Sequence, residues 1–391
     1  MFYYRKETTD VSISFNVPTN FVFGQGVIQK LHKQKLPGKK AMIVISSGKS
    51  TRANGYLDIV QDQLTQAGVE YAVFDKILAN PVIANVMDGA VFGRENGCDF
   101  VIGLGGGSAI DTAKGVSNFH YLFKGKEITV EAITEMLRSG SYKAEHEVID
   151  IISVPSAAGT GSEVTQFATI WDVNKTAKFS IDTPQNYPKM SLVIPELTLT
   201  LPQKLTFSTG VDALSHAIEA YWAKPTTFVV KDIALKAIDT IMTYLPKVLA
   251  DPSNLELRNY QSRGALLAGM AFARTRTTAC HSISYAMTMQ YNVPHGIACC
   301  MTLDPVSKIN REVIVCADDL FNTFEKFGGL QKWLDETAAM ANVSLKLKDW
   351  GVDEAGIDHL VTQTFTKGRM DNNPVDISPE KVKEILQGIY E

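Results

Sequence analysis

The sequence predicts a two-domain protein: an α/β domain with a doubly wound parallel sheet, residues 1–196, followed by an all-helical domain, residues 197–391. Three observations predict this fold class. Short apolar runs alternate with amphipathic stretches in the first half, and a glycine-rich segment suited to a dinucleotide follows one of those runs. Beyond about Leu197, strand-like runs nearly vanish. A length of 391 residues also favours two domains over one.

Four short runs in the first half are predicted to be strands, and the first of them, AMIVIS, is rich in β-branched residues, as is typical of strands buried on both faces of a parallel sheet. The predicted strands are Ala41–Ser46, Tyr71–Phe74, Phe100–Leu104 and Ile151–Val154. Two stretches between them carry apolar residues at helical spacing. The predicted helices are Gly55–Ala67 and Val82–Glu95. Right-handed crossovers place such helices on both faces of the sheet.

The second half contains long amphipathic segments and is predicted to be all-helical. The predicted helices include Gly210–Trp222, Val229–Leu249 and Leu255–Ala273, with further helical pieces to Ile389. The segment Ile194–Thr206 is interrupted by Pro195 and Pro202, which predicts a hinge between the two domains.

The composition narrows the class of protein. The 38 basic residues nearly balance the 42 acidic ones, and no block of like charge could follow a nucleic-acid backbone. The N-terminus lacks an apolar signal core, and no stretch approaches the roughly 18 apolar residues that span a bilayer. We therefore expect a cytoplasmic protein that binds neither nucleic acid nor membrane. The cysteines form no CxxC motif and are predicted to be reduced core thiols: Cys98, Cys280, Cys299, Cys300 and Cys316.

The glycine-rich segment GLGGGSAIDTAK lies between a predicted strand and a predicted helix. Gly105, Gly106 and Gly107 permit a close approach of the backbone to an oxyanion at the start of that helix, and Ser108 adds a hydroxyl. A glycine triplet alone equally suits a merely tight turn. Its position between strand and helix favours a nucleotide diphosphate site.

The residues after the first predicted strand bear on the choice of nucleotide. An acidic residue commonly binds the ribose hydroxyls near this position, whereas this chain has Ser46, Ser47 and Lys49 and no carboxylate. Small hydroxyls beside a lysine suit a 2′-phosphate, so the sequence favours NADP over NAD. The alternative is that Lys49 simply lies in a solvated loop.

Four potential metal ligands are divided between a helix and a downstream loop region: Asp212 and His216, then His281 and His295. The spacing of Asp212 and His216 is one helical turn, so both side chains can bind one ion. A lone histidine on an apolar helix is usually a core residue, but the four together suit Fe²⁺ or Zn²⁺. The other histidines lack such partners and are given no role: His32, His120, His146 and His359.

Four motifs together resemble the iron-containing (group III) alcohol dehydrogenases. They are GGGSAIDTAK, SAAGTGSEVT, GVDALSHAIEAY and VPHG, in the order of that family and spanning about Asn20 to beyond Asp304. The resemblance implies the architecture shared with dehydroquinate synthase, in which the α/β domain binds NAD(P), the helical domain holds iron, and the active site lies in the cleft between them. It further implies a small alcohol or aldehyde substrate and a homodimer or larger homo-oligomer.

The resemblance also assigns residues by motif. The implied metal ligands are Asp212, His216, His281 and His295. The implied pyrophosphate contacts are Gly105, Gly106, Gly107 and Ser108, with Asp111 and Lys114 supporting that turn. A second cofactor-facing loop is implied at Ser156, Gly159, Thr160 and Ser162, and a lysine that contacts the ribose at Lys178.

Two departures from the family pattern bear on mechanism and substrate. Tyr285 stands where many members have a histidine with a proton-relay role; a phenol is a poorer base at neutral pH, and Tyr285 is equally well explained as a packing aromatic. Arg274 and Arg276 stand where relatives that act on simple alcohols are largely apolar, which favours an anionic aldehyde. Their alternative role is to pair with nearby carboxylates or to lie at a subunit interface. The surrounding stretch is similar to members that reduce phosphonoacetaldehyde.

The predicted function is hydride transfer between a nicotinamide and an alcohol or aldehyde, with the metal acting as a Lewis acid. Three alternatives remain: a simple primary alcohol dehydrogenase of the butanol or propanediol type, a sugar-phosphate cyclase of the dehydroquinate synthase type, and a catalytically idle binding protein. Net consumption of NADPH by an aldehyde separates the reductase from the cyclase, which consumes no net cofactor.

Overall fold

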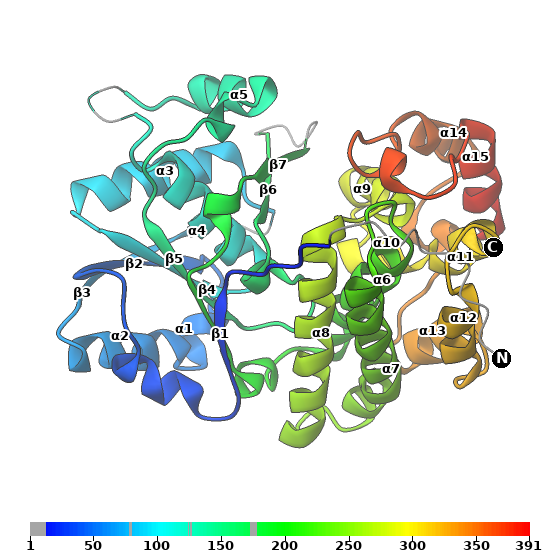
Figure 1. Cartoon of the computed structure of the whole chain (residues 1–391), viewed down its shortest axis with the longest axis horizontal. Helices are drawn as coiled ribbons and strands as arrows, with labels where there is room; N and C mark the ends of the chain where they lie inside the picture. The colour runs from blue at the N-terminus through cyan, green and yellow to red at the C-terminus, as the bar shows by residue number, and fades with distance from the viewer. Residues whose placement is uncertain (1–12, 78–79, 124, 126, 173–177) are drawn as a thin grey trace. The chain divides into compact units, whose positions relative to one another are not determined.

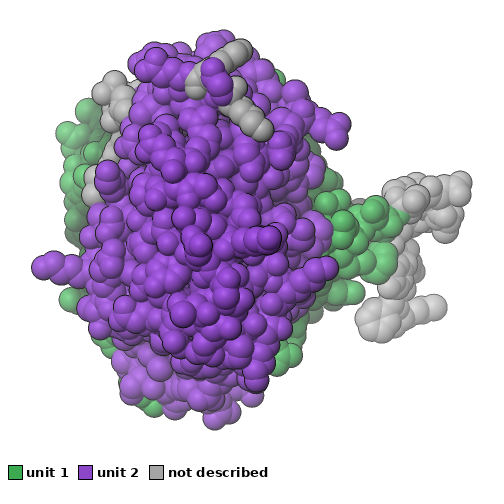
Figure 2. Space-filling view, turned by 90° about the vertical axis from the view of Figure 1, so that its left-hand side faces the viewer, with its two compact units in different colours: residues 1–17, 203–251, 263–391 green, residues 18–202, 252–262 purple. Residues whose placement is uncertain are grey.

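The computed structural model describes residues 13–77, 80–123, 125, 127–172 and 178–391. The chain divides into two compact units, coloured separately in Figure 2. The sheet unit contains residues 18–202 and 252–262, and the helical unit contains residues 13–17, 203–251 and 263–391. The predicted domains, residues 1–196 and 197–391, therefore differ from these units in two places. Residues 13–17 belong to the helical unit, and residues 252–262 belong to the sheet unit. The segment 252–262 belongs to the sheet unit because the buried Arg258 donates to the carbonyl oxygens of Pro252 and Leu201.

The sheet unit is built on a six-stranded sheet in the order β1-β8-β5-β4-β2-β3, in which all neighbours are parallel. Its strands are β1 (Asn20–Phe23), β2 (Lys40–Ser46), β3 (Glu70–Ile77), β4 (Phe100–Gly105), β5 (Asp150–Pro155) and β8 (Met190–Val193). The predicted doubly wound parallel sheet is confirmed. The sequence did not indicate β1 and β8, because each has four residues and too short an apolar run to distinguish from a loop.

Apolar side chains on both faces hold the sheet between helices. Ile43 and Ile45 of β2 pack toward α2 (Tyr56–Gln66) and the 3-10 helix η1 (Val27–Lys33), whereas Met42 and Val44 pack toward α4 (Gly107–Phe119). This alternation is the period of two along a strand. Other α-helices of the unit are α1 (Ser50–Ala53), α3 (Ile83–Glu95) and α5 (Val130–Ser139), and Figure 1 shows α2 and α3 on opposite sides of the sheet.

A separate antiparallel hairpin joins β6 (Phe167–Trp171) to β7 (Lys178–Asp182). Ala168, Ile170 and Ile181 pack with α3 and α5 in a core of their own. The sequence did not predict this hairpin. Its strands are only five residues long, and in β7 the apolar residues alternate with polar ones.

The helical unit is confirmed as all-helical, with no strand among its described residues. Its helices are α6 (Gln203–Trp222), α7 (Phe228–Ala250), the later part of α8 (Leu255–Thr275), α9 (Ala279–Tyr291), α10 (His295–Cys300), α11 (Leu303–Asn310), α12 (Ala317–Glu325), α13 (Leu330–Met340), α14 (Glu354–Thr362) and α15 (Pro379–Gly388). The first of them begins directly after Pro202, inside the segment predicted as a hinge. Among the described residues, no helix is both long and apolar enough to cross a bilayer.

Candidate functional site

One face of α6 carries three buried polar side chains, Asp212, His216 and Glu219. They follow one another at one-turn intervals, so all three project in the same direction. The Nε2 atom of His216 lies 3.9 Å from Oδ1 of Asp212. The close approach predicted from their spacing is therefore present in the folded chain.

His281 and His295 both lie in helices, so their expected placement in a loop region is wrong. His281 is in the first turn of α9, and His295 is the first residue of the short α10. Asn292, with φ of 55°, ends α9 in a left-handed conformation, and Pro294 precedes α10 at a position where its missing N–H costs nothing. Helix α10 was not predicted from the sequence, because this helix is only six residues long and contains a glycine.

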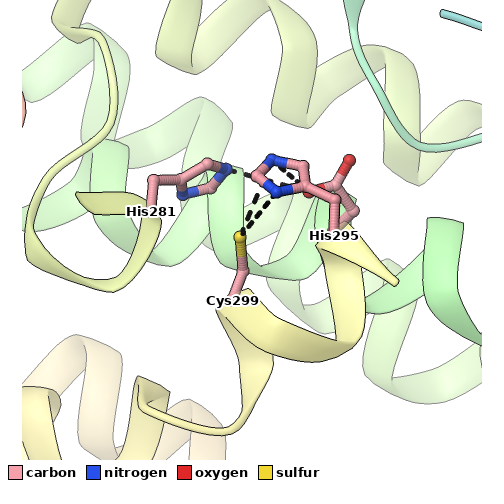
Figure 3. Close-up of side chains that lie close together, drawn as sticks. His281, His295 and Cys299 are labelled. Carbon is pink, nitrogen blue, oxygen red and sulfur yellow. Dashed lines mark hydrogen bonds and ion pairs between the residues drawn. The ribbon is translucent and has the colours of Figure 1, made fainter. Parts of the chain in front are cut away.

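These helices bring the side chains together (Figure 3). Oδ1 of Asp212 lies 3.7 Å from Nε2 of His281 and 4.0 Å from Nε2 of His295. Two donors that each lie about 2.1 Å from one ion are roughly 3.4–4.2 Å apart, so this set fits a divalent cation. The ring of His216 stacks on that of His281 with centroids 4.7 Å apart. The predicted ligands therefore converge, with His216 outside the tightest group.

That tightest group has a fourth member that sequence reasoning did not assign to the site. Ligand atoms of Asp212, His281, His295 and Cys299 all lie within 4.8 Å of one another. Burial raises the pKa of the Cys299 thiol well above its ordinary value. The signal was available, since Cys299 follows His295 by the same one-turn spacing as His216 follows Asp212. The prediction of core thiols is also wrong for Cys316, which is exposed.

Glu219 is a second residue that sequence reasoning missed. Its carboxylate accepts hydrogen bonds from the Nδ1 atom of His281, from the backbone N–H groups of Thr278 and Cys280, and from the Thr278 hydroxyl. Burial raises the pKa of Glu219 to about 7, and the hydrogen bonds from Thr278 and His281 oppose that rise. Glu219 thus fixes the ring of His281 and leaves Nε2 directed at Asp212.

Gly296 allows α10 to approach α6. A Cβ atom on this glycine would lie 1.9 Å from the carbonyl oxygen of Ser208 and 2.8 Å from Cβ of Asp212. Any side chain there would push the two helices apart. The glycine of the VPHG motif is therefore a packing requirement that holds His295 and Cys299 beside Asp212.

Tyr285 lies one turn after His281 on α9 and is buried. Its ring stacks on that of His295, with centroids 5.8 Å apart and an interplanar angle of 19°. This position places a phenol beside the proposed ligands, and it is compatible with both proton transfer and packing.

Arg274 and Arg276 are brought together, but in a pocket that the metal-ligand group does not line. This pocket of about 210 Å³ also contains Gly368, Asp371 and Asn372. Arg276 has a left-handed backbone with φ of 62°. Asp371 thus lines the same pocket as the two arginines, and the alternative role for these arginines requires such a nearby carboxylate.

The residues predicted to bind the nucleotide lie at the carboxyl ends of neighbouring parallel strands. Ser46 ends β2, Gly105 ends β4 and Ser156 follows β5. The chain turns outward from β2 to β3 and returns to β4 on the other side, which creates a topological switch point. Ligands of open α/β sheets bind at such points. The remaining predicted residues of these loops are Ser47, Lys49, Gly106, Gly107, Ser108, Gly159, Thr160 and Ser162.

Buried polar contacts join the loops after β4 and β5. Asp111 accepts hydrogen bonds from the Ser162 hydroxyl at 2.6 Å and from the Thr169 N–H at 2.8 Å. Lys114 donates to the carbonyl oxygens of Thr165 and Phe167, both at 2.8 Å. These contacts make Asp111 and Lys114 internal supports of the loops.

Two further predicted residues complete this region. A Cβ atom on Gly107 would lie 2.8 Å from Cγ2 of Thr160, so the glycine permits the two loops to touch. Lys178 pairs with Trp171 across the hairpin, and its Nζ atom lies 5.7 Å from the centre of that ring.

Comparison with known proteins matches both halves of the chain. Residues 18–195 match the family described as iron-containing alcohol dehydrogenase, and residues 206–390 match its C-terminal counterpart. The chain is 31% identical to 1,3-propanediol dehydrogenase of Klebsiella pneumoniae, over 96% of this chain and 98% of that protein. It is 29% identical to NADPH-dependent butanol dehydrogenase of Clostridium saccharobutylicum, over 96% and 97%. Sulfoacetaldehyde reductase of Bifidobacterium kashiwanohense, solved with NAD+, superposes with a TM-score of 0.85 at 27% identity, covering 97% of this chain and 99% of that one.

Proposed function

The chain belongs to the iron-containing alcohol dehydrogenase family, and from this premise we propose that it reduces a small anionic aldehyde with a nicotinamide cofactor. The family supports alcohol dehydrogenase and aldehyde reductase chemistry as such. It also makes the cyclase alternative unnecessary, because both halves match dehydrogenase families. The observation that carries the proposal is the convergence of Asp212, His281 and His295 within ligand distance of one another.

We propose that Asp212, His216, His281 and His295 hold a divalent iron ion. When bound, the ion supplies a Lewis acid for hydride transfer at the substrate carbon. Glu219 keeps the His281 ring in one tautomer, so that Nε2 carries a lone pair rather than a proton. Tyr285 supplies or receives the proton that accompanies hydride transfer, through its phenol beside His295.

The cofactor is proposed to bind at the switch point of the sheet, with its pyrophosphate at Gly105, Gly106, Gly107 and Ser108. Ser156, Gly159, Thr160 and Ser162 provide the second loop, and Lys178 contacts the ribose. Relatives divide on the cofactor, since one is named NADPH-dependent and another was solved with NAD+. The end of β2 supports NADP, because Ser46, Ser47 and Lys49 offer hydroxyls and a cation and no carboxylate.

The proposed negative charge of the substrate rests on Arg274 and Arg276 and on one comparison. Sulfoacetaldehyde carries a sulfonate, and its reductase is a structural neighbour of this chain. Arg276 stands two residues before Thr278, which donates to Glu219, the same carboxylate that binds His281. A short ordered segment therefore ties Arg276 to the proposed ligands. Phosphonoacetaldehyde is the substrate we propose first.

A second candidate, a dehydrogenase of simple primary alcohols, is favoured by different observations. Two relatives, at 31% and 29% identity, are named for propanediol and butanol. Asp371 lies in the pocket of the two arginines and offers their charge an internal partner. In this case the arginines stabilise the fold and make no contact with the substrate.

The deciding experiment compares phosphonoacetaldehyde, sulfoacetaldehyde, succinic semialdehyde and butanal with NADH and with NADPH, under added Fe²⁺. We expect charged aldehydes to have kcat/KM values at least about tenfold above butanal, which corresponds to one good charge-assisted contact. Arg276→Ala should remove that advantage and retain butanal turnover, whereas Arg311→Ala, elsewhere in the helical unit, should change neither. Equal kcat/KM values for charged and uncharged aldehydes would refute the anionic substrate and leave the reductase assignment intact.

A further inference from the structure

Cys299 lies among the proposed metal ligands, and we propose that its thiol is itself a donor to the ion. The centre then contains sulfur in addition to the oxygen and nitrogen donors of the proposed function, on which this inference rests. Figure 3 shows the Cys299 side chain pointing from α10 toward the imidazole rings of His281 and His295.

The distances match a shared cation. The Sγ atom lies 3.8 Å from both ring nitrogens of His295. Zinc bonds of about 2.3 Å to sulfur and 2.0–2.1 Å to nitrogen place two donors roughly 3.5–4.4 Å apart. A sulfur atom equally far from both nitrogens is aligned with the lone pair of neither. The geometry therefore fits common ligation better than a directional S–H···N hydrogen bond.

The local fold explains why this cysteine and no neighbouring one is a donor. His295 and Cys299 form a one-turn pair on α10, as Asp212 and His216 do on α6, and Gly296 lets the two helices touch. Cys300 is equally buried, but its thiol donates to the carbonyl oxygen of Ile297 at 3.2 Å. It also lies outside the group of converging ligand atoms.

A thiolate ligand affects which metal ion the site prefers to bind. One carboxylate and one thiolate balance the charge of a divalent ion, and the S–H proton leaves to solvent as the sulfur–metal bond forms. Soft sulfur ligands suit zinc and iron better than the harder ions that oxygen ligands suit, such as magnesium and manganese. We infer that Cys299 favours iron or zinc over harder divalent ions such as Mg²⁺.

Cobalt is a probe that tests two claims separately: that the chain binds a metal ion at this site, and that Cys299 is one of its ligands. The full-length chain is stripped of metal and given one equivalent of Co²⁺. Visible ligand-field bands report that the ion is bound, and a near-ultraviolet charge-transfer band reports a cobalt–thiolate bond. We expect both in the parent chain. Cys299→Ala should lose the charge-transfer band and keep the visible bands, whereas the matched control Cys300→Ala should keep both.

Every other outcome refutes either the role of Cys299 or the metal centre itself. Visible bands without a charge-transfer band, or a charge-transfer band that persists in Cys299→Ala, overturn the role of Cys299 and leave the metal centre standing. Failure of the parent chain to bind Co²⁺ overturns the proposed function itself. If Cys299→Ala does not fold, zinc X-ray absorption on the parent chain decides: a sulfur shell at about 2.3 Å supports the inference, and its absence refutes it.

Discussion

Glu219 on α6 accepts a hydrogen bond from Nδ1 of His281 on α9, and this contact determines which nitrogen of the ring faces Asp212. The same carboxylate accepts from the N–H groups at the start of α9, so one side chain both caps the helix and orients its histidine. Neither residue is more than 2% exposed. The contact with Glu219 thus favours the tautomer of His281 that carries its proton on Nδ1.

Glu219→Gln should therefore weaken metal binding without removing a proposed ligand. The amide retains the size of the side chain but carries no charge to hold the Nδ1 proton of His281. Loss of such an outer partner typically costs 10–100-fold in metal affinity. Competition dialysis against a chelator measures this, with the exposed Glu312→Gln as control. Equal metal affinity in the variant and the parent would show that Glu219 only caps α9.

The part of the site that lies on a single helix was predictable from residues spaced one helical turn apart. That spacing paired Asp212 with His216, and the same rule applied onward from His216 and His295 leads to Glu219 and Cys299. The convergence of α6 with α9 and α10 was not predictable from spacing, because it depends on the contact of Gly296 with Ser208. Helix periodicity describes one helix at a time and says nothing about which helices touch.

The fold, like the site, was predictable from the sequence only in part. The central strands β2 and β4 have continuous apolar runs because both of their faces are buried, and this makes them visible in the sequence. The strands β1 and β8 have four residues each, and their pairing is fixed by contacts with distant segments. The exchange of residues 252–262 between units likewise depends on the tertiary contacts of Arg258.

His281→Ala tests the metal centre most directly. The variant should lose bound metal, and kcat should fall at least about a thousandfold, because Lewis-acid stabilisation is worth several kcal/mol. Nucleotide binding should be retained, since His281 and the proposed nucleotide loops belong to different units. Metal analysis, turnover and nucleotide titration measure the three properties, with the exposed His359→Ala as control. Turnover by metal-free His281→Ala would refute the assignment.

Gly296→Ala tests the contact between α10 and α6. An added Cβ would collide with the Ser208 carbonyl, so α10 must move and carry His295 with it. We expect about 1–3 kcal/mol of destabilisation together with weaker metal binding. Gly388→Ala is the matched control, because no atom lies within 4 Å of a Cβ built there. Unchanged metal affinity in Gly296→Ala would mean that the site tolerates the shift of α10.

Tyr285→Phe distinguishes proton transfer from packing. The ring remains and continues to stack on His295, while the hydroxyl is lost. If the phenol relays a proton, kcat should fall about 100-fold or more, with metal content and cofactor binding unchanged. Steady-state kinetics and metal analysis on the same preparations test this. A kcat equal to that of the parent would assign Tyr285 to packing alone.

We expect Glu163 to make the stability of the sheet unit depend on pH. Burial raises the pKa of this carboxyl from 4.5 to about 7, and Lys114 opposes that rise. The native chain therefore binds more protons than the unfolded chain between these two values, so stability falls as pH rises through that window and levels off above it.

Glu163→Gln should remove this contribution. Relative to the parent, its melting temperature should rise between about pH 5 and pH 8, by an amount that reflects at most a few kcal/mol. Lys114, whose pKa burial lowers to about 8, keeps its carbonyl partners Thr165 and Phe167 in the variant. Thermal unfolding monitored across this range, with the exposed Glu145→Gln as control, provides the measurement. If the difference in melting temperature between variant and parent were the same at every pH, Glu163 would have the same pKa in the folded and unfolded chains.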